Sequence, residues 1–124
     1  MENHSPDDPV AMYMRELSTI EPLTKLEETA LFEKLRGTIG TQQGELIERR
    51  LIESQLPLVV SIAEKHSASG VPMLDLIQDG NIGLMKSVKC FAEAPTADFP
   101  VFAATCIEES IKRRTQKQNK RSDW

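Results

Sequence analysis

Two acidic residues stand one helical turn apart in the middle of the chain, where they could act as a general acid and a general base. Asp75 and Asp79 are four positions apart, so on a helix both carboxylates would lie on one face. Such pairs are also common on solvated helix faces, and nothing around these two selects a substrate. The ordinary interpretation is an acidic surface, so the pair alone predicts no catalysis.

The other residue types that do chemistry are few and unsuitably spaced. His4 and His66 are far apart and match no metal-binding spacing. Cys90 and Cys106 form no C-x-x-C pair, which argues against a zinc site or a disulfide scaffold and suits a reducing cytoplasm. No nucleophile elbow, phosphate-binding loop or dinucleotide fingerprint occurs. We therefore expect a binding module with no catalytic residues, no metal and no cofactor.

The elements that position these residues are all expected to be helices, because apolar residues recur at spacings of three and four. Asp8 before a proline, and Thr24 with Glu27 in a capping box, mark two helix starts. The expected helices cover residues 9–18, 24–37, 45–54, 57–67, 74–90 and 100 onward. Three glycines within 37–44 predict a flexible linker, and residues 92–98 predict a loop.

Charge is distributed unevenly along the 124 residues, which are 40% hydrophobic and carry a formal net charge of −4. Residues 1–111 hold nine basic and eighteen acidic side chains, whereas residues 112–121 hold six basic ones and no acid. An acidic body is a poor candidate for binding nucleic acid over its whole surface. The length suits one domain, and no apolar run is long enough to span a membrane.

One block of sequence is highly specific. The run Leu74-Asp-Leu-Ile-Gln-Asp-Gly-Asn-Ile-Gly-Leu-Met-Lys, with Leu58-Val-Val-Ser-Ile-Ala-Glu-Lys and Gly70-Val-Pro before it, resembles region 2 of the sigma-70 family of bacterial transcription initiation factors. Upstream, Asp8-Pro-Val-Ala-Met-Tyr-Met-Arg-Glu-Leu resembles region 1.2 of the same family. The resemblance implies an all-α fold with region 1.2-like helices in 1–40, a compact region 2-like domain in 41–114 and a basic, frayed tail in 115–124.

In the family, one face of region 2 docks on the clamp coiled coil of the polymerase β′ subunit. The resemblance therefore implies a polymerase-binding set that keeps the family's residues or close substitutes. The matching positions are Leu56, Val59, Leu74, Asp75, Gln78, Asp79, Asn81 and Met85. Short apolar side chains among acidic and amide groups suit a basic amphipathic partner helix.

The family's second surface melts and reads promoter DNA at the minus-ten element, and here the sequence departs from the family. Ala94, Pro95, Ala97 and Asp98 stand where relatives favour basic or aromatic residues, and Thr105 and Cys106 replace a tryptophan pair. Glu108 and Glu109 add negative charge that repels phosphate. The remaining candidates for DNA contact are Phe99, Phe102, Lys112, Arg113 and Arg114.

Three hypotheses follow from this comparison. The leading one is a sigma-like cytoplasmic protein that binds core RNA polymerase, has weak or lost promoter recognition, and acts as a regulator or competitor of sigma. The second is a divergent or truncated active sigma factor that still binds and melts promoter DNA. The third is a non-catalytic scaffold that binds an anti-sigma protein or its own copy. None of them involves a membrane.

Overall fold

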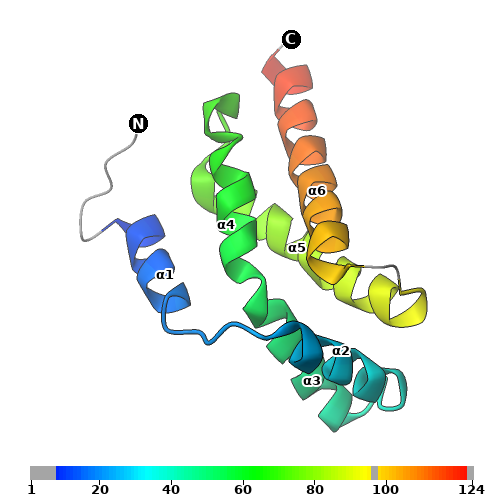
Figure 1. The fold of residues 1–124 in the computed structure, drawn as a ribbon. Helices are drawn as coiled ribbons and strands as arrows, with labels where there is room; N and C mark the ends of the chain where they lie inside the picture. Colours follow the sequence, from blue (N-terminus) through cyan, green and yellow to red (C-terminus); the bar gives the residue numbers. More distant parts are fainter. Residues whose placement is uncertain (1–7, 96–97, 123–124) are drawn as a thin grey trace.

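The computed structural model describes the backbone of residues 8–95 and 98–122, and the side chains up to Lys117 (Figure 1). The expected polar N-terminus with His4, and loop residue Ala97, lie outside the described residues. The described residues form α-helices and one 3-10 turn, with no strand, so the all-α expectation is confirmed. The helices are α1 (Pro9–Leu17), α2 (Lys25–Arg36), α3 (Gln42–Ser54), α4 (Leu56–Glu64), α5 (Met73–Glu93) and α6 (Phe99–Ser122).

The first three helices begin at side chains that cap their free backbone N–H groups. The Asp8 carboxylate accepts from the Val10 N–H at 2.8 Å, and Thr24 and Glu27 form the expected capping box. Thr41 caps α3 by accepting from the Gly44 N–H at 3.0 Å. The expected linker over 37–44 was therefore wrong in its second half, because α3 begins at Gln42 and Gly44 is a buried residue within it.

The middle of the chain follows the proline and glycine positions. Helix α3 stops at Gln55, and α4 begins with Pro57 in its first turn, as expected for a residue without an N–H. Helix α4 ends at Glu64, before the expected residue 67, and a 3-10 turn (Ser67–Ser69) follows. Gly70 then takes a positive φ of 89°, which turns the chain into α5.

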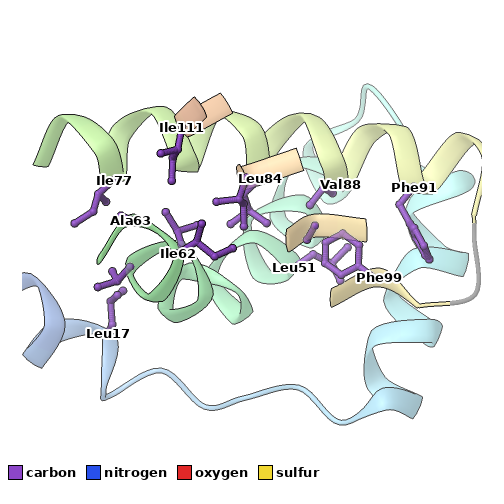
Figure 2. Close-up of a cluster of buried hydrophobic side chains, with 14 of the residues drawn as sticks. Leu17, Leu51, Ile62, Ala63, Ile77, Leu84, Val88, Phe91, Phe99 and Ile111 are labelled. Carbon is purple, nitrogen blue, oxygen red and sulfur yellow. The ribbon is translucent and has the colours of Figure 1, made fainter. Parts of the chain in front are cut away.

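Helices α5 and α6 pack against each other and carry most of the core, and α4 covers them (Figure 1). Figure 2 shows Leu84, Val88, Phe99 and Ile111 directed into one buried cluster, to which Leu17 of α1 also belongs. Gly80 and Gly83 allow α6 to approach α5 closely: a Cβ on Gly83 would stand 2.6 Å from the Cys106 carbonyl oxygen. The boundary at residues 40 and 41 stays a prediction, although Phe32 and Leu35 of α2 join the same core.

Helix α6 continues to Ser122 in the described backbone, and fraying of the tail after residue 114 stays a prediction. No glycine or proline interrupts the sequence after Pro100, and basic residues near a helix C-terminus interact favourably with the helix dipole. Helix α5 likewise runs three residues past the expected end at Cys90.

Candidate functional site

The exposed face of α5 carries a stripe of partly apolar side chains. Leu74 is 41% exposed, Gln78 is exposed, and Met85 is 49% exposed, so three of the sequence-predicted docking residues lie on this face. Ile82 is 48% exposed and completes the helical spacing between Gln78 and Met85. The sequence analysis missed Ile82, although its spacing from both residues could have identified it.

The carboxylates of Asp75 and Asp79 flank this stripe, and both are held by the same arginine of α6. Arg114 Nη2 lies 3.3 Å from Asp75 Oδ2, and Arg114 Nε lies 3.6 Å from Asp79 Oδ2. The contact between Arg114 and Asp79 is an ion pair that is too long to be a hydrogen bond. Asp79 Oδ2 therefore has no hydrogen-bond partner among the described residues. Asn81 Oδ1 is likewise buried without a partner in the described part of the chain. Two side-chain oxygens beside the stripe can therefore each still accept a hydrogen bond.

Two members of the predicted docking set lie elsewhere. Val59 is fully buried in α4, and its Cγ1 would stand 2.7 Å from a Cβ on Gly80, so its role here is to pack between α4 and α5. Its place in the predicted docking set stays a prediction, for which the side chain exposes no surface in this conformation. Leu56 is half-buried and packs against the core cluster.

The predicted DNA-contact residues separate into buried, paired and exposed groups. Phe99 is fully buried, with its ring centroid 4.8 Å from that of Phe32 and 5.3 Å from that of Phe91. Its ring exposes no face on which a base could stack in this conformation, and its assignment to DNA contact stays a prediction. Phe102 is half-buried at the edge of the cluster, 5.9 Å from Phe91.

Of the three basic candidates on α6, Arg114 is held by the two aspartates, whereas Lys112 and Arg113 are exposed. Neither Lys112 nor Arg113 forms an ion pair with any described residue. Lys112 and Arg113 therefore keep accessible and unpaired basic charge on the described part of this helix.

A groove of about 500 Å³ lies between α4 and α6 and carries mixed charge. Its lining includes Lys65 and Lys112 as well as Glu108 and Glu109. Glu108 Oε1 lies 2.8 Å from His66 Nε2, a contact across 42 positions that no residue spacing indicates. The carboxylates of Glu108 and Glu109 repel phosphate, so this groove is a poor binding site for a DNA backbone.

The described residues offer little reactive chemistry. They include no group of three or more side chains suited to hold a metal ion, and no described helix is long and apolar enough to cross a membrane. Burial raises the pKa of the Cys106 thiol, and the nearby Glu109 adds to the rise, so the reactive thiolate is disfavoured. The exposed α5 face, with its apolar side chains and flanking carboxylates, is consequently the best candidate for a functional site.

A comparison with protein families gives the class to which this small helical domain belongs. The model of sigma-70 region 2 matches residues 51–121, which include α4, α5 and most of α6. The chain belongs to the sigma-70 family.

Two relatives show how much of such a protein the chain represents. It is 40% identical over 107 residues to RNA polymerase sigma factor SigA of Lactococcus lactis subsp. cremoris, and 39% identical over 107 residues to SigA of Listeria monocytogenes. These alignments cover 86% of this chain and 29% and 27% of the two relatives. The chain therefore spans less than a third of the length of the relatives it matches.

Proposed function

We propose that the chain binds core RNA polymerase through the exposed face of α5, with the clamp coiled coil of β′ as the partner, and that it recognises minus-ten DNA weakly or not at all. Such a protein regulates transcription or competes with a complete sigma factor. One observation carries the proposal: the α5 face keeps its exposed apolar stripe and flanking carboxylates, whereas the DNA-facing side has a buried Phe99 and added acids.

The chemistry of the α5 face supports a basic amphipathic helix as the partner. Leu74, Ile82 and Met85 present apolar surface that is already partly solvent-exposed, so docking would remove it from water. Asp75 and Asp79 then lie where arginine or lysine side chains of the partner could form charge-assisted hydrogen bonds. This combination of apolar centre and charged rim is that of a specific protein interface.

The test is binding of the purified chain to core RNA polymerase. Binding is measured from the fluorescence anisotropy of a labelled chain. Met85→Glu places a charge on the stripe and should weaken binding at least about tenfold, as expected for an interface residue that contributes more than 1.4 kcal/mol. Leu46→Glu is the matched control, because Leu46 is 58% exposed on α3, away from the α5 stripe. Failure of the unmodified chain to bind core polymerase would refute the proposal.

A divergent active sigma factor remains the second candidate function, favoured by the exposed Lys112 and Arg113 on α6. This candidate requires single-stranded minus-ten DNA to bind the chain–polymerase complex. Lys112→Ala with Arg113→Ala should then lower DNA affinity and flatten its salt dependence, because each phosphate contact releases counterions. DNA binding that is undetectable at low salt would reject this second candidate.

A further inference from the structure

A continuous acidic hollow lies on the opposite part of the molecule from the end of α6. A cavity of about 340 Å³ opens beside the α2–α3 turn and the end of α5, and one of about 400 Å³ continues along α3. Glu45, Glu48 and Lys89 line both cavities, so the two form one groove, called here the acidic groove.

Carboxylates outnumber cations two to one in the lining of the acidic groove, so the protein neutralises them only in part. Near the turn, Glu45, Glu48 and Glu93 face one ammonium, that of Lys89, and farther along α3 Glu53 is matched by Arg49. Among the described residues, none of these side chains forms an ion pair. The groove therefore offers net negative charge to a partner.

The floor of the acidic groove is apolar and firmly held. Leu35 and Ala92 are buried beneath it, and Ile39 stands 58% exposed at its rim. The Arg36 guanidinium donates from Nε to the Ala92 carbonyl at 3.0 Å, which ties α2 to the end of α5. A Cβ on Gly44 would meet the Thr38 carbonyl oxygen, so the α2–α3 turn is tightly packed. A partner would meet a preformed surface.

The chain itself has exposed basic side chains whose charge is complementary to that of the acidic groove. Arg113 and Lys117 lie one turn apart on α6, are exposed, and form no ion pair with any described residue. Long basic side chains can lay their aliphatic stems over Ile39 while their charged ends reach carboxylates. The end of α6 and the α2–α3 turn lie at opposite ends of the molecule (Figure 1). The end of α6 therefore cannot reach the acidic groove of its own chain.

We propose that the acidic groove binds the basic end of α6 from a second copy of this chain. The two contact patches differ, so the association is head-to-tail and can extend beyond a dimer. It uses neither the α5 stripe nor polymerase, and so does not depend on the proposed function.

The test is sedimentation velocity of the whole chain at concentrations up to about 500 µM, because exposed charge pairs bind weakly. The average mass should rise with concentration at about 50 mM salt and return to that of the monomer at about 500 mM, where charges are screened. Glu45→Lys with Glu48→Lys reverses the groove, and Arg113→Glu with Lys117→Glu reverses the helix end. Each double variant should be monomeric alone, and an equimolar mixture of the two should associate again.

A matched control changes the same amount of charge elsewhere. Glu16→Lys with Glu64→Lys alters exposed acids that line neither part of the acidic groove, and this variant should associate at least as well as the unmodified chain. Restored association in the mixture distinguishes the proposed contact from misfolding of either variant. A chain that stays monomeric at low salt, or a mixture that does not associate, overturns the proposal and leaves the groove to a foreign basic partner.

Discussion

Arg114 occupies the two carboxylates that the proposed polymerase contact needs, so its removal should strengthen that contact. Its guanidinium bridges Asp75 and Asp79 at 3.3 and 3.6 Å, and an incoming arginine or lysine must displace it. The side chain of Arg114 is 44% exposed, and those of Asp75 and Asp79 are 41% and 26% exposed. Water therefore screens both pairs substantially, and each is worth about 0.2–1 kcal/mol.

These values set the expected size of the effect. Displacing both pairs costs the partner about 0.4–2 kcal/mol, and the long contact to Asp79 favours the lower half of that range. Arg114→Ala should therefore tighten binding to core polymerase roughly 2- to 10-fold. Anisotropy titrations at low salt measure this change, and it should shrink at high salt because the competing pairs are screened.

Arg113→Ala is the matched control, since it removes the same charge from the neighbouring exposed position, which pairs with no described residue. It should leave polymerase affinity within about twofold, in line with an exposed side chain outside the interface. Weaker binding by Arg114→Ala, with an unchanged circular dichroism spectrum, would refute the competition and show that Arg114 supports the docking face instead. Absence of binding by the unmodified chain would instead reject the proposed function itself.

Three further predictions concern stability and use chemical or thermal unfolding. Gly83→Ala should lower the free energy of unfolding by about 1–2 kcal/mol, because its Cβ would stand 2.6 Å from a backbone oxygen and the resulting strain exceeds the helix-propensity gain; Gly37→Ala, with its nearest atom at 3.8 Å, should not destabilise. Phe99→Ala should cost about 3–5 kcal/mol as a core truncation, and an effect below 1 kcal/mol would contradict its burial. Burial raises the pKa of the Glu28 carboxyl despite its ion pair with Lys25, so ionisation of Glu28 opposes folding as pH rises through the folded-state pKa. Glu28→Gln should therefore raise the unfolding midpoint at pH 7 but not near pH 3. Equal shifts of the midpoint at both pH values would disprove this role of Glu28 ionisation.

Local signals in the sequence predicted the helices well, because capping side chains and proline act within a few residues. Thr24, Glu27 and Pro57 therefore marked their boundaries correctly. Gly44 misled the prediction, since its lack of a side chain permits close packing against Thr38 rather than a flexible linker. That distinction depends on a tertiary contact, which local sequence does not reveal.

The sequence predicted where the candidate site lies on α5, but it did not predict which side chains of other helices contact that site. Helical spacing and the family resemblance placed Gln78 and Met85 on an accessible face, and both are exposed there. Neither source revealed that Val59 is buried or that Arg114 contacts Asp75 across 39 positions. Such contacts depend on how α5 crosses α6, and that geometry follows from the packing of whole helices.

The crossing of α5 and α6 joins two surfaces that the sequence presents as separate. Gly80 and Gly83 let α6 approach α5 closely, and this approach brings Arg114 of the predicted DNA-contact set onto Asp75 and Asp79 of the predicted docking set. An arginine used for this bridge cannot at the same time hold a phosphate, so occupation of the docking face by a basic partner would release it. Polymerase binding would then add one positive charge to the α6 surface. DNA affinity should accordingly be higher for the polymerase complex than for the free chain, and Arg114→Ala should remove that difference while leaving the contribution of Lys112 and Arg113.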